Sequence, residues 1–451
     1  MEKKLSRKQT IIVASTLFGM FFGAGNLIFP VHLGQLAGSN TLAATIGFIV
    51  TAVTIPILGV AAIGSTHSDG LQDLSSRVSK GYGYFFTCLL YLTIGPFFAI
   101  PRCATTSFTV GVSALVPGAN QKIVLLFFSV MFFAAVLAFS LKPQGITIWI
   151  GRIINPVFLV FLGILVVAAM IHPGAAVSAV EPVEAYKNGA FFNGFIEGYG
   201  TMDAIAGLAF GIVVVDIIRS MGVEKDGDIA AGVLKSGIYT GLLMALIYVL
   251  TIVMGTQSRG LFPVSENGGV ALAQISGHYL GSIGSVVLAL TITFACLKTA
   301  IGLVTSCSET FVKMFPKKLS YNSWVCCITA FSLLVSNIGL SKIIEYSIPA
   351  LMFIYPLAIT LIILALTGKL FDHDTCVYRW VTGFAMFAAV FDLFKTLPAG
   401  IQSALMLDRL TALAAKVLPF FNIGLGWLVP SVIGLVIGLV IHKRHGYISS
   451  K

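Results

Sequence analysis

The sequence predicts an all-α integral membrane protein with twelve transmembrane helices, the first and sixth of which are broken at mid-membrane. Only 10% of its 451 residues are charged and 57% are hydrophobic, whereas soluble proteins carry about 25% charged residues. Charged groups are therefore too few to cover a globular surface. Glycine-rich interruptions within two hydrophobic stretches complete the prediction, because lipid tolerates irregular backbone only where it lines a cavity inside the protein.

Twelve hydrophobic stretches are each close to the roughly 20 residues that a helix needs to cross a bilayer. The connections between them are short, so residues 1–451 are expected to form a single transmembrane domain. The expected helices are residues 10–37, 41–64, 83–115, 122–141, 149–171, 193–219, 234–255, 281–311, 323–340, 342–367, 376–397 and 421–442.

Basic residues set the expected orientation. With the N-terminus in the cytoplasm and the helices alternating in direction, Lys and Arg concentrate on the cytoplasmic side, as the positive-inside rule requires. Both termini are then cytoplasmic. The net charge of +10 is explained by attraction to anionic membrane lipid, so we expect no nucleic acid and no obligatory protein partner.

The first interruption reads Phe-Phe-Gly-Ala-Gly-Asn-Leu-Ile-Phe-Pro at residues 21–30. Unwinding a helix there frees N–H groups and carbonyls, and the half-helix that follows directs its positive dipole end into the cavity. The N–H groups can hold a carboxylate, and the freed carbonyls can hold a cation such as Na⁺. A broken helix at this depth indicates the binding site of a secondary transporter.

The second interruption is expected in the sixth helix, where Gly207 and Gly211 fall near the middle of residues 193–219. The first and sixth helices run in opposite directions, as an inverted five-plus-five repeat requires. The two repeats would be residues 10–171 and 193–367, and residues 376–442 would add helices eleven and twelve.

Apolar side chains surround both interruptions, among them Phe21, Phe22 and Phe210. An apolar wall beside main-chain donors suits a zwitterion with an apolar side chain, whereas a sugar or a nucleotide would require many polar side chains. The chain has no Thr-Val-Gly-Tyr-Gly channel filter, no phosphate-binding loop and no hydrolase motif. We therefore expect a carrier, and neither a channel nor an enzyme.

Three charged residues inside the predicted helices are candidates for coupling or gating, because ionisable groups within the membrane are rarely without function. Lys298 shares one helical face with Gly302 and Thr305. It either changes protonation during transport or forms a structural ion pair, for which Asp203 is a candidate partner. Asp203 belongs either to a gate or ion path or to a water-facing vestibule, and Arg102 either to an outer gate or to a structural pair.

The first interruption, together with Thr-Met-Asp-Ala-Ile-Ala-Gly-Leu-Ala-Phe-Gly at residues 201–211, resembles the branched-chain amino acid:cation symporters of bacteria, the BrnQ or LIV-II type. The resemblance covers essentially the whole chain. It implies the LeuT fold of the amino acid–polyamine–organocation superfamily, a place in the bacterial cell membrane, and uptake of Leu, Ile and Val driven by Na⁺, or by H⁺ in some members. A proton-coupled or exchanging amino acid carrier of the same fold is the alternative.

The resemblance also implies residues for the substrate. At the first interruption it points to Ala24, Gly25 and Asn26, with the N–H groups of Ala24 and Gly25 holding the carboxylate. At the second it points to Gly207, Phe210 and Gly211, with Phe210 against the side chain of the substrate.

For Na⁺, the resemblance implies carbonyl ligands from Gly19 and Phe22. The eighth helix of the LeuT fold adds a small residue and two hydroxyls in the pattern small-x-x-Thr-Ser, which Gly302, Thr305 and Ser306 match. A second sodium site in some relatives requires a Thr where this chain has Ile205, so the resemblance does not imply that second site here.

Overall fold

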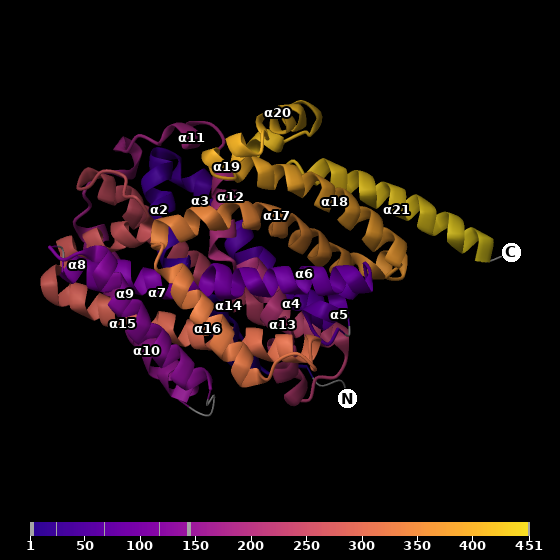
Figure 1. Ribbon diagram of the computed structural model, residues 1–451, viewed down its shortest axis with the longest axis horizontal. Helices are drawn as coiled ribbons and strands as arrows, with labels where there is room; N and C mark the ends of the chain where they lie inside the picture. Colours follow the sequence, from indigo (N-terminus) through magenta and orange to yellow (C-terminus); the bar gives the residue numbers. More distant parts are fainter. Residues whose placement is uncertain (1–3, 24, 67, 117, 142–145, 450–451) are drawn as a thin grey trace.

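The computed structural model describes residues 4–23, 25–66, 68–116, 118–141 and 146–449, which form helices and connecting turns without any strand (Figure 1). Among these residues, seven helices are long and apolar enough to cross a membrane, or eight if the bent pair α12 and α13 is one span. Helical segments occur in each of the twelve predicted ranges. The all-α membrane fold is confirmed, and the number of twelve crossings stays a prediction.

The helices of the first half are α1 (Arg7–Phe21), α2 (Gly25–Ala37), η1 (Gly38–Asn40), α3 (Thr41–Ile49), η2 (Val50–Thr54), α4 (Ile55–Ser65), α5 (Leu71–Ser76), α6 (Lys80–Leu92), η3 (Thr93–Phe97), α7 (Ala99–Ser107), η4 (Phe108–Val112), α8 (Ser113–Leu115), α9 (Gln121–Ser140) and α10 (Ile146–Ile171).

Those of the second half are η5 (Val177–Ala179), α11 (Glu184–Lys187), α12 (Ala190–Glu197), η6 (Gly198–Thr201), α13 (Asp203–Ser220), α14 (Asp226–Gln257), η7 (Ser258–Gly260), α15 (Gly268–Met314), α16 (Tyr321–Ser336), α17 (Leu340–Thr367), η8 (Gly368–Phe371), α18 (Thr375–Thr396), α19 (Ala399–Ala404), α20 (Asp408–Val417), η9 (Phe421–Ile423) and α21 (Leu428–Ser449).

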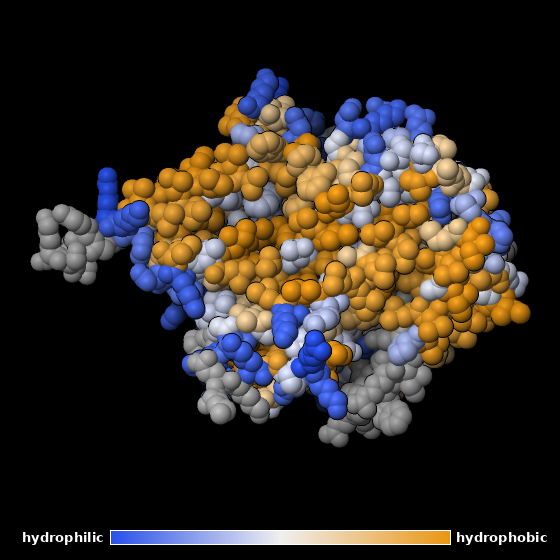
Figure 2. All heavy atoms as spheres, turned by 180° about the vertical axis from the view of Figure 1, so that it is seen from behind, coloured by the Kyte–Doolittle hydropathy of each residue, from blue (hydrophilic) through white to orange (hydrophobic). Residues whose placement is uncertain are grey.

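Large apolar side chains cover the outside of the helical bundle. Ile283 is 81% exposed, Met131 73% and Leu334 72%. Figure 2 shows a broad hydrophobic surface across one face, with hydrophilic residues gathered toward its margins. A soluble monomer rarely exposes so large an apolar area, so this surface fits contact with lipid and the protein is a multi-pass membrane protein.

The first predicted interruption is confirmed. The helix α1 ends at Phe21, Phe22 is extended (φ −74°, ψ 99°), and α2 begins at Gly25. Within α2, Pro30 has no N–H group, so the carbonyl of Asn26 one turn earlier has no helical donor. The sequence therefore frees main-chain polar groups on both sides of the break.

The sixth predicted helix is also interrupted, but not at the predicted position. The turn η6 ends at Thr201, Met202 adopts a left-handed conformation (φ 64°, ψ 11°), and α13 begins at Asp203. The two halves are bent by 45°. The expectation that Gly207 and Gly211 form the break is wrong, because both lie inside the regular helix α13.

Gly207 and Gly211 instead allow α13 to pack closely against α4. A Cβ atom at Gly207 would lie 2.5 Å from the carbonyl oxygen of Pro56, and one at Gly211 would lie 3.0 Å from the side chain of Ile63. Small residues that let helix backbones approach are typical of membrane helix interfaces.

A third irregularity brings α7 to the same region. The segment between α6 and α7 contains Gly95 in a non-helical conformation (φ −95°, ψ −124°) followed by Pro96. Proline removes a helical hydrogen bond and kinks the chain. The kink turns α7 so that Arg102 lies beside both interruptions.

Candidate functional site

A cavity of about 410 Å³ lies between the two interruptions and is closed by α7 and α15. Its volume is within the roughly 300–1,000 Å³ typical of small-molecule sites. Its apolar lining comprises Met20, Phe21, Ile94, Ala99, Met202, Ala206, Phe210, Val213, Ile301 and Leu303. The other lining residues are polar, charged or glycine, namely Gly19, Gly23, Gly25, Asn26, Arg102, Cys103, Thr201, Asp203, Lys298, Thr299, Gly302, Thr305, Ser306 and Glu309.

Asn26 joins the two interruptions. Its Nδ2 donates to Asp203 Oδ2 over 2.5 Å and to the Tyr248 hydroxyl of α14 over 2.6 Å. Its Oδ1 accepts the N–H group of Gly23 over 2.9 Å. The amide therefore holds the start of α2, the start of α13 and the middle of α14 together, and its hydrogen-bonding capacity is largely used.

Arg102 binds the carbonyl groups that the second interruption releases. Its Nη1 donates to Gly200 O over 2.6 Å and its Nη2 to Thr201 O over 3.5 Å. The guanidinium also stacks 5.3 Å from the ring centre of Phe29. Arg102 is 4% exposed, and no carboxylate of the described residues lies within ion-pair distance, so its observed partners are carbonyls.

Gly25 is required by this arrangement. A Cβ atom there would lie 2.9 Å from Arg102 Nη2 and 3.3 Å from Thr201 Cα. Both atoms belong to the opposite wall of the site. The missing side chain lets the start of α2 approach the guanidinium and the second interruption.

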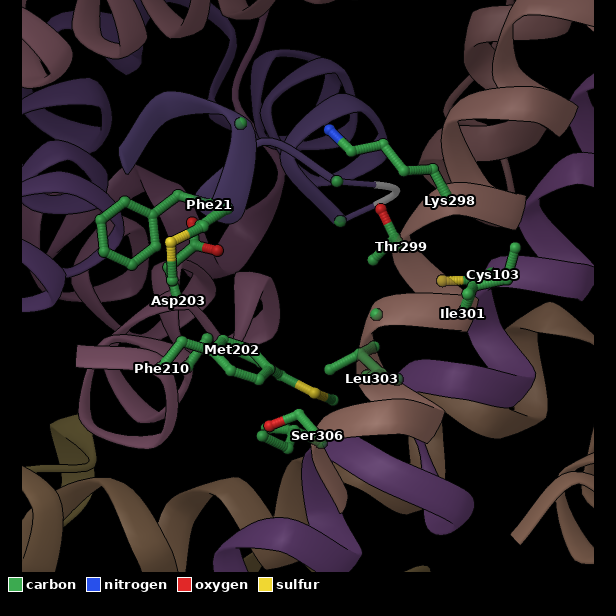
Figure 3. A pocket seen from close by; sticks show the side chains of 18 of the residues that line it. Phe21, Cys103, Met202, Asp203, Phe210, Lys298, Thr299, Ile301, Leu303 and Ser306 are labelled. Atoms are coloured by element: carbon green, nitrogen blue, oxygen red, sulfur yellow. The ribbon is translucent and has the colours of Figure 1, made fainter. Parts of the chain in front are cut away.

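Lys298 is half-buried and projects from α15 into the cavity. Figure 3 shows its side chain reaching toward the ribbon of the first interruption, with Asp203 on the opposite side of the cavity. Within the described part of the chain, Lys298 makes no ion pair, so the pairing with Asp203 left open by the sequence is absent.

The predicted sodium residues lie largely together. Gly19, Gly302, Thr305 and Ser306 line the cavity. Phe22 does not line it, but the next residue in the chain, Gly23, does. A Cβ atom at Gly302 would meet open space. The Thr305 hydroxyl has no hydrogen-bond partner among the described residues, so its oxygen is available to a ligand.

The predicted substrate residues divide into two groups. Gly25, Asn26 and Phe210 line the cavity. Gly207 and Gly211 face α4 instead and are not brought to it. Ala24 lies outside the described residues.

Several lining residues escaped the sequence analysis. Glu309 follows Lys298, Gly302 and Thr305 on the same face of α15, so helical periodicity could have identified it. Met202 carried no such signal, and neither did Tyr248, which does not line the cavity but binds Asn26. Tyr248 is brought in by tertiary packing, and a left-handed Met cannot be read from the sequence.

The cavity is open on one side and closed on the other. It extends to exposed Val213, in the second half of α13, and to exposed Glu309, near the C-terminal end of α15. On the opposite side, Arg102 is bound to η6 and the ring of Phe29 packs against Gly200. Among the described residues, these contacts close the cavity on the side of η6 and leave it open on the side of Val213 and Glu309.

Two broken helices that enclose a mostly apolar cavity in a membrane bundle are typical of secondary transporters. Residues 6–445 match the family described as "Branched-chain amino acid transport protein", and the chain belongs to this family. It is 49% identical over 449 residues to the branched-chain amino acid permease BrnQ of Lactobacillus delbrueckii subsp. lactis, covering 98% of this chain and 100% of that protein. It is 40% identical over 441 residues to BrnQ of Bacillus subtilis, covering 98% of each chain.

Solved structures agree on the fold. The inward-facing conformation of Mhp1 matches with a TM-score of 0.64 at 12% identity, covering 96% of this chain and 91% of that one. MhsT in complex with L-phenylalanine matches with a TM-score of 0.58 at 15% identity, covering 98% and 99%. These likenesses establish the arrangement of the helices.

Proposed function

We propose that the protein is a secondary active symporter that imports Leu, Ile and Val together with Na⁺ by alternating access. The observation that carries the proposal is the cavity itself, in which main-chain donors of a broken helix stand beside apolar walls. The relatives named as branched-chain amino acid permeases support the choice of substrate. The proposed location is the bacterial cell membrane, with both termini in the cytoplasm.

The substrate carboxylate would lie at the N-terminus of α2, where Gly25 presents its N–H group and the positive end of the helix dipole. Its apolar side chain would contact Phe210 and the neighbouring Phe21 and Met202. A cavity of about 410 Å³ has room for any of the three branched-chain side chains.

Na⁺ would bind between the carbonyls of Gly19 and Phe22 on one side and Gly302, Thr305 and Ser306 on the other. Hard cations prefer oxygen ligands, and this donor set consists of neutral oxygens. The hydroxyl of Thr305, which has no hydrogen-bond partner in the part of the chain that the structure describes, and the open space at Gly302 fit an ion at this position.

Transport would couple the two sites through rocking of one helical repeat against the other. The proposed repeats are residues 10–171 and 193–367, with residues 376–442 outside them. One positive charge moving across 100 mV supplies about 2.3 kcal/mol. Because about 1.4 kcal/mol corresponds to a factor of ten, one Na⁺ can sustain a substrate gradient of roughly fifty-fold before its own concentration gradient is added.

The alternative, a proton-coupled or exchanging carrier, is favoured by one observation. Lys298 is the positively charged group nearest the Gly302–Thr305 stretch along α15, and it has no ion-pair partner among the described residues. A titrating ammonium group there could replace a bound Na⁺ during the cycle.

Uptake of radiolabelled leucine into proteoliposomes tests the proposal. An imposed inward Na⁺ gradient should drive accumulation that isoleucine and valine inhibit and alanine inhibits weakly. Accumulation driven by an H⁺ gradient alone would replace the sodium proposal with its alternative. Absence of leucine uptake under every gradient, with intact folded protein in the membrane, would contradict the proposed function.

A further inference from the structure

Asp203 is an acidic group in the wall of the substrate cavity. It is the first residue of α13 and is 3% exposed. The left-handed Met202 turns the chain directly before it, so the break in the sixth helix fixes where this carboxylate lies. Figure 3 shows the side chain at the cavity beside Phe21 and Met202.

The charge of Asp203 is only partly compensated. Its Oδ2 accepts the Asn26 amide over 2.5 Å, and the hydroxyls of Thr201 and Tyr248 also stabilise the carboxylate, but these partners are all neutral. No Lys, Arg or His of the described ranges lies within 4.0 Å of the carboxylate. A buried charge without a charged partner is costly, so a positively charged ligand at this carboxylate would be strongly stabilised.

The two neighbouring cations do not fill this role. Arg102 is close enough to act on Asp203 electrostatically, but its guanidinium donates to the carbonyls of Gly200 and Thr201. Lys298 projects from α15 on the opposite side of the cavity (Figure 3). Neither cation therefore forms an ion pair with the carboxylate, which lines the cavity and can be reached by a charged group that enters there.

The position of Asp203 relative to α2 indicates which group that is. Asn26, which binds Asp203, follows Gly25 at the start of α2, where the proposed function locates the substrate carboxylate. In an α-amino acid the ammonium group is one carbon away from the carboxylate. A substrate whose carboxylate lies at the start of α2 thus has its ammonium group within reach of Asp203.

We propose that the Asp203 carboxylate is the receptor for the ammonium group of the transported amino acid. This inference rests on the proposed function and adds the residue that selects amino acids over other branched carboxylic acids. Asn26 acts as a positioning residue, because its amide holds Oδ2 and so fixes the carboxylate in the cavity wall.

The test compares two ligands that differ only in the ammonium group. Direct equilibrium binding of radiolabelled L-leucine and of radiolabelled 4-methylpentanoate is measured on the purified full-length protein. Asp203→Asn should weaken leucine binding at least about tenfold, as loss of a charge-assisted hydrogen bond does. It should leave binding of 4-methylpentanoate unchanged or tighter, because repulsion between two carboxylates is removed.

Two further variants control for folding. Asp216→Asn alters an exposed carboxylate on the same helix α13, paired with Arg219 over 3.6 Å, and should change neither affinity. Asp203→Glu keeps the charge and should keep a preference for leucine over 4-methylpentanoate larger than that of Asp203→Asn. If Asp203→Asn does not fold, Asp203→Glu is compared with wild type: a changed preference for leucine over 4-methylpentanoate supports the inference, because the carboxylate has moved by one methylene, and an unchanged preference contradicts it.

Three results would overturn the inference. Leucine affinity could stay unchanged in Asp203→Asn, or both ligands could lose affinity by the same factor, as expected of a purely structural residue. The variant could instead raise the Na⁺ concentration needed for leucine binding without altering the preference between the ligands, which would make Asp203 a sodium ligand. If wild-type protein binds no leucine, the proposed function itself fails, and this outcome is distinct from the other three.

Discussion

Replacement of Thr305 by Val gives the sharpest prediction for the proposed sodium site. Val has nearly the shape of Thr and exchanges the hydroxyl for a methyl group. The Thr305 hydroxyl lines the cavity and has no hydrogen-bond partner within the described ranges. The substitution should therefore leave the fold of α15 unchanged and remove one oxygen ligand from the ion.

The size of the effect follows from that missing oxygen. By analogy with hydrogen bonds to charged groups, one neutral oxygen on an ion contributes about 1.5–3 kcal/mol. Because about 1.4 kcal/mol corresponds to a factor of ten, the Na⁺ concentration for half-maximal leucine uptake should rise about 10- to 150-fold. Leucine uptake at saturating Na⁺ should fall much less.

The assay is the Na⁺ dependence of leucine uptake in proteoliposomes, with Thr299→Val as the matched control. Thr299 also lines the cavity from α15, but its hydroxyl donates to Ala295 O over 3.1 Å. The control should keep the wild-type Na⁺ dependence. Thr305→Ser should keep it as well, because Ser retains the hydroxyl group. An unchanged Na⁺ dependence in Thr305→Val, or an equal shift in the control, would refute the assignment of Thr305 to the ion.

Three other substitutions test the remaining parts of the site. Arg102→Gln should weaken the contact between α7 and η6. In protein whose other cysteines are Ser, it should therefore increase labelling of buried Cys103 by a membrane-impermeant thiol reagent. Labelling equal to that of the same protein with Arg102 intact would count against a role of Arg102 in closing the site. Phe210→Ala should raise the KM for leucine about 5- to 30-fold, since about 1–2 kcal/mol of apolar contact is lost, and should affect alanine less; an equal effect on both amino acids would remove Phe210 from the side-chain pocket. Gly207→Val should lower the free energy of unfolding in detergent by about 1–3 kcal/mol, because the added side chain overpacks against Pro56. Gly302→Ala should not lower it, because a Cβ atom at Gly302 meets open space. Equal stability of the two variants would contradict the packing described for α13.

The first interruption was predictable because its signals are local. Two glycines and a proline weaken the helix at residues 21–30 whatever surrounds them, and α1 does end at Phe21 with α2 beginning at Gly25. The stripe Lys298, Gly302, Thr305 was predictable for a similar reason. Helical periodicity alone brings these residues to one face, which is the face that lines the cavity.

The second interruption could not be located from composition. Glycine serves both to break membrane helices and to let them pack closely, and Gly207 and Gly211 serve the second purpose against α4. The real break depends on Met202 in a left-handed conformation that costs on the order of 1–3 kcal/mol. Surrounding contacts, including those of Arg102 with Gly200 and Thr201, maintain it, and such long-range contacts cannot be read from the sequence.

A map of the protein in lipid nanodiscs with L-leucine and Na⁺ bound tests the central claim most directly. We predict density for the amino acid between the N-terminus of α2 and Asp203, with its apolar end toward Phe210. Density for leucine elsewhere in the bundle, or continuous α-helix through residues 22–24 and 202 in the bound protein, would contradict the account.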